Sequence, residues 1–142
     1  MIDTKLIAAH QWVVDESQKK PGWWAEQAVM GATAMELVHS VLTWDSGWDA
    51  IVVLLVLIVA PLLVHAARTP HILKSLGQST WVRGLFLGLV ALDAFTLFAT
   101  DQIGINVIDL LGTVLMLSYY CFAACDDPKP PKRKEKLVPT AA

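Results

Sequence analysis

The chain has 142 residues, a length that allows one domain at most. Hydrophobic residues make up 55% of it and charged residues only 17%, whereas soluble domains usually have about 25% charged residues. With a mean hydropathy of +0.51, this composition argues against a soluble domain and predicts a membrane protein. The net charge of -2 gives no reason to expect nucleic acid as a partner.

Residues 1–48 form a region outside the predicted spans. The stretch DESQKKPGWW marks a break within it, and residues 25–44 then have a helical pattern with one polar face. That face consists of Thr33, Glu36, Ser40 and Thr43. We expect an amphipathic interfacial helix that lies flat on the membrane surface. A helix packed on the spanning bundle fits the pattern almost equally well, whereas a fourth span would require Glu36 to be buried.

Residues 49–125 are predicted to form the membrane domain, with three helical spans at about 50–67, 82–100 and 103–125. The link between the second and third spans is so short that these two helices must form an antiparallel hairpin. Tryptophans flank the predicted elements, as is typical of membrane interfaces. The expected interfacial anchors are Trp23, Trp24, Trp44, Trp48 and Trp81.

Basic residues predict the orientation in the membrane. The loop between the first two spans carries Arg68, Lys74 and Arg83 without an acidic residue. The tail, residues 126–142, is expected to be disordered, and its Lys132-Arg133-Lys134 serves topology and contact with anionic lipids. Because positive flanks stay cytoplasmic, three spans predict an integral membrane protein with its N-terminus outside and its C-terminus cytoplasmic. Four spans would instead place the N-terminus inside, with the basic loop.

The second and third spans each carry a polar stripe. Residues spaced by three and four positions form these stripes: Asp93, Thr96 and Thr100, and Asn106, Asp109 and Thr113. From Gly84 onward the second span contains no Lys or Arg to pair with the acids, and neither does the third; a charge at the bilayer centre costs about 2.5–3.5 kcal/mol. Three interpretations stay open. The acids are protonated, they hydrogen-bond across the helices, or they line a water-filled lumen made by several copies.

The sequence contains two other short motifs, one of paired glycines and one of a glutamate with a histidine. Gly84 and Gly88 form a GxxxG motif, roughly opposite Asp93, that predicts close approach of a neighbouring helix. Glu36 and His39 have the spacing of a di-iron ligand pair, but the chain holds one copy where a metal site needs two. The sequence contains none of the common nucleophile, phosphate-binding or metalloprotease motifs. We therefore expect no catalytic activity, no metal and no cofactor.

The predicted topology resembles class I phage holins, small membrane proteins with three spans, an outer N-terminus and a short basic tail. The resemblance covers residues 50–136. It implies a homo-oligomer that opens lesions in the inner membrane to release an endolysin, with both polar stripes lining the lumen. The long N-terminal region, residues 1–48, departs from the holin pattern. It leaves open a non-catalytic accessory or assembly subunit of a larger membrane protein, or an immunity or superinfection-exclusion protein.

Overall fold

The structure, a computed structural model, describes residues 2–99 and 101–130. This part of the chain forms six helices and no strand, which confirms the predicted all-α fold. The helices are α1 (Ile2–Ser17), α2 (Pro21–Leu42), α3 (Gly47–Arg68), α4 (Pro70–Gly77), α5 (Thr80–Ala99) and α6 (Ile103–Ala123). The three predicted spans are confirmed, since α3, α5 and α6 are long and apolar enough to cross a membrane. Thr100, Lys132, Arg133 and Lys134 lie outside the described residues.

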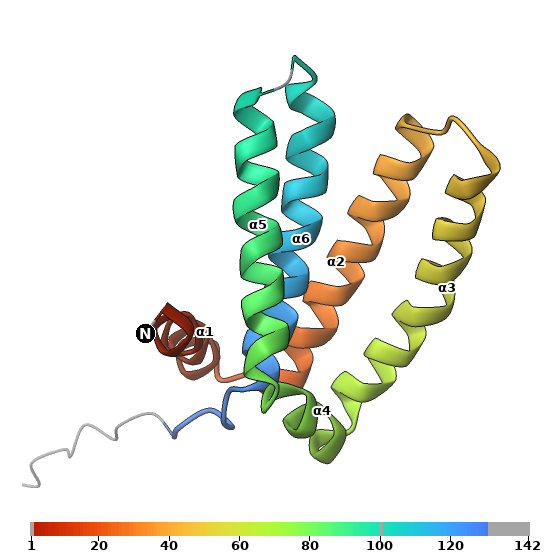
Figure 1. Ribbon diagram of the computed structural model, residues 1–142. Helices are drawn as coiled ribbons and strands as arrows, with labels where there is room; N and C mark the ends of the chain where they lie inside the picture. The colour runs from red at the N-terminus through yellow and green to blue at the C-terminus, as the bar shows by residue number, and fades with distance from the viewer. Residues whose placement is uncertain (1, 100, 131–142) are drawn as a thin grey trace, which may run out of the picture.

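Four long helices run side by side (Figure 1). α2 packs against α3 on one side and α6 on the other, and α6 packs in turn against α5. The order across the molecule is therefore α3, α2, α6, α5. α4 joins α3 to α5 at one end of the bundle, and α1 lies across that same end, seen nearly end-on in Figure 1.

α2 packs along the bundle, the second of its two predicted placements, and does not lie flat across the end. Its buried residues include Ala25, Ala28, Val29, Ala32 and Ser40, whereas Met30, Val38, Val41 and Leu42 are exposed. The large apolar side chains thus face outward. This is the arrangement expected in lipid, which solvates apolar groups and forces polar ones toward other helices.

Short local signals fix where several helices begin. Pro21 and Pro70 occupy the first turns of α2 and α4, where their missing N–H groups need no partner. Ser46 starts α3 as part of a capping box with Asp49. Gln18, with φ of 57°, ends α1 in the left-handed region and turns the chain toward α2. The sequence pattern predicts this break, but it predicts neither α1 nor α4.

All described Lys and Arg residues gather at the end of the bundle that holds α1 and α4, which we call the basic end. They are Lys5, Lys19, Lys20, Arg68, Lys74, Arg83 and Lys129. The opposite end, which we call the acidic end, holds the α2–α3 and α5–α6 turns. Asp45, Asp49 and Asp101 lie there. The described Lys and Arg residues are thus confined to one end of the bundle, which also holds six acidic residues: Asp3, Asp15, Glu16, Glu26, Asp126 and Asp127.

Both described ends of the chain lie at the basic end. The Gln11 side-chain amide donates to the Asp126 carbonyl and accepts from its N–H, and the Asp15 carboxylate accepts from the Lys129 N–H. The predicted orientation, with the N-terminus outside and the C-terminus inside, stays a prediction. Four long helices, α2, α3, α5 and α6, lie between the two described ends.

The hydrophobic core lies near the basic end, where α1, α2, α4 and α6 meet. It includes Val14, Ala25, Val29, Leu73, Tyr119 and Phe122. Trp24 packs against this core, because its ring stacks on Phe122 with centroids 5.8 Å apart and its Nε1 donates to the Ser17 hydroxyl. It therefore has a packing role, unlike an interfacial anchor. The other four predicted anchors are exposed near helix ends: Trp23 and Trp81 at the basic end, Trp44 and Trp48 at the acidic end.

Gly77 is expected to tolerate no side chain. It ends α4 against the backbone of Ala123 and Ala124, and a Cβ atom there would overlap both. We expect Gly77→Ala to lower the free energy of unfolding by about 1–3 kcal/mol, the usual cost of overpacking. Denaturant titration in mixed micelles measures this. Gly84→Ala is the matched control, since no described atom lies within 4 Å of its Cβ position. Equal losses in both variants would contradict the close contact.

Candidate functional site

Three carboxylates lie at one depth of the bundle. Glu36 precedes the end of α2 at Leu42 by six residues, Asp93 precedes Ala99 by six, and Asp109 follows Ile103 by six. At 1.5 Å per residue, each lies about 9 Å from its helix terminus at the acidic end. We call these three residues the carboxylate layer. Among the described residues no Lys or Arg lies at this depth, so the layer has no basic partner there.

The two predicted polar stripes face each other in the α5–α6 hairpin. The Thr113 hydroxyl donates to Asp93 Oδ2 at 2.7 Å and lies 3.0 Å from the Asp109 backbone carbonyl. Since a hydroxyl has one hydrogen, it serves one of these acceptors at a time. Thr96 donates to the Asp93 carbonyl within α5, and Asn106 is half-buried on α6. The structure thus joins the stripes through Asp93 and Thr113.

A histidine, His39, lies close to the carboxylate layer. His39 lies on α2, less than one turn beyond Glu36, and within electrostatic range of Asp109. It is also within range of Asp49 at the start of α3. The sequence predicts Glu36 on the polar face of an amphipathic helix and indicates for His39 no more than the spacing of a metal pair with Glu36. Among the described residues no group of three or more His, Cys, Asp or Glu is arranged to hold a metal ion.

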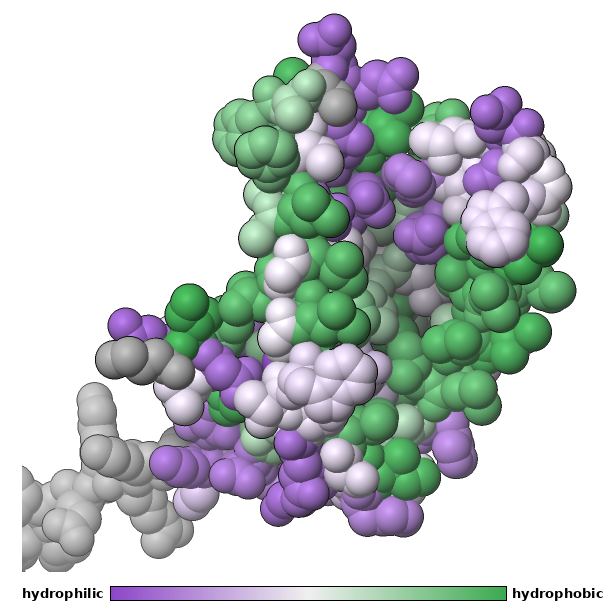
Figure 2. All heavy atoms as spheres, viewed as in Figure 1, coloured by the Kyte–Doolittle hydropathy of each residue, from purple (hydrophilic) through white to green (hydrophobic). Residues whose placement is uncertain are grey.

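A cavity of about 340 Å³ opens between the helix pairs beside the carboxylate layer. Its polar lining comes from Thr33, Glu36 and Thr113, and its outer walls are apolar side chains of α3 and α5 such as Val59 and Phe86. α3 and α5 have no extensive packing contact in the described chain, so the cavity is open between them. Figure 2 shows hydrophilic residues gathered in this hollow near the acidic end, with hydrophobic surface on both flanks.

The predicted GxxxG motif faces away from the other helices. A Cβ atom at Gly84 or Gly88 would meet no described atom within 4 Å. Leu85, Leu92 and Phe95 of the same helix are also exposed. The close helix contact predicted for this motif is therefore not made between described residues of one chain.

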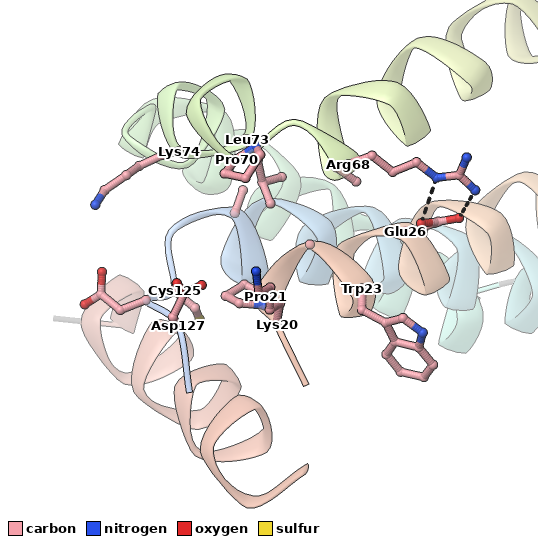
Figure 3. Close-up of a pocket in the computed structure, with 14 residues that line it drawn as sticks. Lys20, Pro21, Trp23, Glu26, Arg68, Pro70, Leu73, Lys74, Cys125 and Asp127 are labelled. Carbon is pink, nitrogen blue, oxygen red and sulfur yellow. Dashed lines mark hydrogen bonds and ion pairs between the residues drawn. The ribbon is translucent and has the colours of Figure 1, made fainter. Parts of the chain in front are cut away.

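A second cavity, of about 550 Å³, lies at the basic end (Figure 3). The start of α2, the end of α3, α4 and the segment after α6 form its walls. Arg68 and Glu26 form an ion pair of 2.6 Å at this cavity. Lys20, Lys74 and Asp127 also line it (Figure 3). It is separated from the carboxylate layer by most of the length of the bundle.

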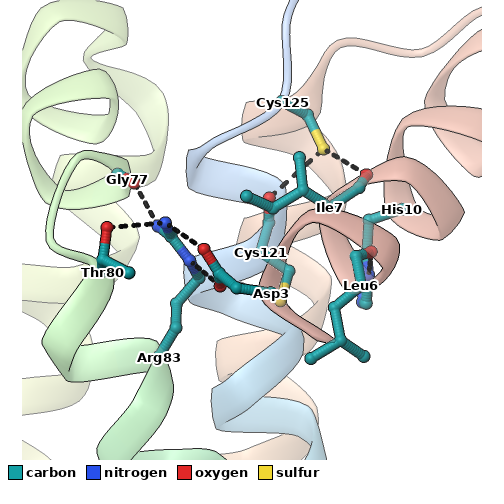
Figure 4. Close-up of polar contacts among 9 residues, drawn as sticks. All are labelled: Asp3, Leu6, Ile7, His10, Gly77, Thr80, Arg83, Cys121 and Cys125. Atoms are coloured by element: carbon teal, nitrogen blue, oxygen red, sulfur yellow. Dashed lines mark hydrogen bonds and ion pairs between the residues drawn. The ribbon is translucent and has the colours of Figure 1, made fainter. Parts of the chain in front are cut away.

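α1 is fastened to the bundle by a nearly buried arginine (Figure 4). Arg83 donates from Nε to Asp3 Oδ1 at 2.6 Å and from Nη2 to Oδ2 at 3.0 Å, and it also donates to the Gly77 carbonyl. Its side chain is only 6% exposed. Arg83, considered in the sequence for topology alone, is thus a structural residue that joins α1, α4 and α5.

Cys121 and Cys125 are both free cysteines. The Cys125 thiol, just beyond α6, donates to the Cys121 carbonyl at 3.2 Å. Burial raises the pKa of Cys125 to about 12, so the thiol stays neutral at physiological pH. These residues contribute packing between α6 and α1 and offer no reactive thiolate.

Comparisons with protein-family models, curated proteins and solved structures find no match to this chain. The fold and the site define its class: an all-helical membrane protein with a layer of carboxylates, one of which, Glu36, lines the hollow between its helices.

Thr113→Val should weaken the α5–α6 hairpin. Valine keeps the volume of threonine but removes the hydroxyl that donates to Asp93. Hydrogen bonds between membrane helices contribute about 0.6 kcal/mol on average and up to about 1.7. We expect a loss of unfolding free energy in this range, measured by denaturant titration in micelles. Thr113→Ser, which keeps the hydroxyl, should recover most of it; equal loss in both variants would show that the bond contributes nothing.

The contact between α1 and the bundle should be lost in acid. The hydrogen bonds from Arg83 hold the pKa of Asp3 below its ordinary value of 3.8. Because the pKa of Asp3 is lower in the docked state, the ion pair stabilises docking at pH values above 3.8. This stabilisation is lost as the pH falls through the lowered pKa. Protease cleavage after α1, followed against pH with an acid-active protease, measures this. Asp3→Asn should release α1 at neutral pH, whereas Glu16→Gln should leave it docked.

Proposed function

We propose that the protein associates with copies of itself in the bacterial inner membrane and opens it in the manner of a holin. The observation that carries this proposal is the carboxylate layer, which has no Lys or Arg partner at its depth among the described residues and whose Glu36 lines a hollow open between α3 and α5. Ionisable residues inside a membrane protein are functional by default, because their burial is costly.

The proposed topology has four membrane helices with both chain ends in the cytoplasm. α2 has 22 residues, a length of about 33 Å at 1.5 Å per residue, which matches the hydrocarbon core. The basic end carries every described Lys and Arg, and positive flanks stay cytoplasmic. This topology differs from that of class I holins. Support for lesion formation therefore comes from the carboxylate layer and not from the topology that first indicated holins.

Association of several copies explains how the carboxylate layer would be hydrated. Joining copies across the opening between α3 and α5 would place their layers around one shared, water-filled lumen. The outward-facing Gly84 and Gly88 would allow a close helix contact between copies, since no atom of the described chain occupies that face. Hydration of the lumen then offsets the cost of the unpaired carboxylates.

A second candidate function is an accessory subunit of a larger membrane complex. The apolar walls of the cavity favour it, because side chains such as Leu55, Val59, Phe86 and Leu89 would bury a helix of a partner. Glu36 would then pair with a basic residue of that helix. This candidate predicts a stable, harmless protein that copurifies with one partner at fixed stoichiometry.

Inducible expression in a bacterial host tests the proposal, with membrane potential and optical density followed over time. We expect an abrupt loss of potential after a lag, and lysis when an endolysin is supplied. Glu36→Gln with Asp93→Asn and Asp109→Asn should lengthen the lag and slow the leak, because the lumen loses its charged lining.

Asp45→Asn with Asp101→Asn is the matched control, since both carboxylates lie at the acidic end outside the layer. It should behave as the unmodified chain does. Normal growth with the protein inserted in the membrane would exclude lesion formation and leave the accessory subunit.

A further inference from the structure

The cavity at the basic end lies where the ends of α2, α3 and α6 meet α4. Its walls are formed by the first residues of α2, the last of α3, and the chain that follows α6. Pro21, Ala67, Leu73 and Ala123 give it an apolar floor, and the exposed Trp23 stands at its rim. Tryptophan at such a position is typical of the boundary between hydrocarbon and headgroups.

The charged lining has both signs. Arg68 donates two hydrogen bonds to the Glu26 carboxylate. Lys19, next to the cavity, makes a cation–π contact with Trp23: its Nζ lies 3.7 Å from the ring centroid. The charged side chains that remain at the cavity are Lys20, Lys74, Asp126 and Asp127. None of these four side chains makes an ion pair or a hydrogen bond with another described residue.

We infer that this cavity binds the headgroup of a phospholipid that carries both a phosphate and a primary ammonium group, as phosphatidylethanolamine does. Two free ammonium groups and two free carboxylates make the cavity complementary to a zwitterion: Lys20 and Lys74 take the phosphate, and Asp126 and Asp127 take the ammonium. A purely anionic headgroup would pair with the lysines but would be repelled by the carboxylates. A quaternary ammonium has no N–H to donate to them.

The dimensions agree with this ligand. A volume of about 550 Å³ is in the range of small-molecule sites and leaves room for the glycerol backbone above the apolar floor. Close packing keeps the cavity walls in place. A Cβ atom at Gly22 would overlap the Ala67 carbonyl, and Leu73 is 5% exposed. The inference needs only the membrane location of the basic end and does not depend on lesion formation.

Native mass spectrometry of the full chain tests the assignment. The protein is released from micelles that hold equal amounts of phosphatidylethanolamine, phosphatidylcholine and phosphatidylglycerol with identical acyl chains. We expect retention of phosphatidylethanolamine to exceed that of the other two by about tenfold, equivalent to about 1.4 kcal/mol. Equal retention of all three lipids would overturn the inference.

Two double variants separate the two halves of the headgroup. Lys20→Gln with Lys74→Gln should reduce retention of phosphatidylethanolamine and phosphatidylglycerol together, because the phosphate site is lost. Asp126→Asn with Asp127→Asn should abolish the preference for phosphatidylethanolamine over phosphatidylglycerol. Lys5→Gln with Lys129→Gln, which removes the same charge away from the cavity, should change neither.

A competition experiment distinguishes a bound lipid from a free soluble ligand. Soluble glycerophosphoethanolamine should not displace the lipid at equal concentration, because it lacks the acyl chains that hold the lipid at the interface. Displacement by this compound would assign the cavity to a free headgroup and overturn the lipid assignment. Unchanged retention of phosphatidylethanolamine in both double variants of the cavity residues would also overturn the lipid assignment.

Discussion

The close seam between α2 and α6 is the contact on which the arrangement of the other helices depends. The small residues Ala25, Ala28 and Ala32 of α2 are buried there. Across the seam, a Cβ atom at Gly112 would meet Met35 Cβ at 3.5 Å and the Ala32 carbonyl at 3.9 Å. Because α2 occupies this place, it separates α3 from α5 and leaves the hollow open. The same seam brings Glu36 to the depth of Asp109.

The spans and the hairpin were predictable because they depend on local properties: an apolar run of sufficient length and a short link. The pairing of Asp93 with Thr113 was also foreseeable, since equal distances from the turn bring the stripes together. The placement of α2 along the bundle was one of two alternatives that the sequence left open. An amphipathic pattern defines two faces but not the solvent that each face meets, and Glu36 was therefore assigned to the water side. The equal distance of all three acids from their helix ends was the signal that would have found it.

The orientation of the chain in the membrane depends on that one helix. The basic loop and tail favour the cytoplasmic side, and including α2 changes the number of long helices from odd to even. α1 and α4 were missed for a different reason. The docking of α1 depends on Asp3 and Arg83, 80 positions apart in the chain, and no local pattern encodes such a contact. α4 is an eight-residue helix between two long ones, too short for its periodicity to stand out.

Pro61 gives α3 a mechanical character that its uniform apolar sequence conceals. Proline has no N–H, so the Leu57 carbonyl lacks its usual helical partner and the helix bends most easily there. Toward the basic end, α3 is fixed by the Tyr119 hydroxyl, which donates to the Leu63 carbonyl at 2.9 Å, and by the pair of Arg68 with Glu26. Toward the acidic end, Leu54, Leu55 and Ile58 are exposed. A bend at Pro61 would therefore move the outer half of α3 and change the width of the opening between α3 and α5, while the carboxylates on the other helices would keep their places.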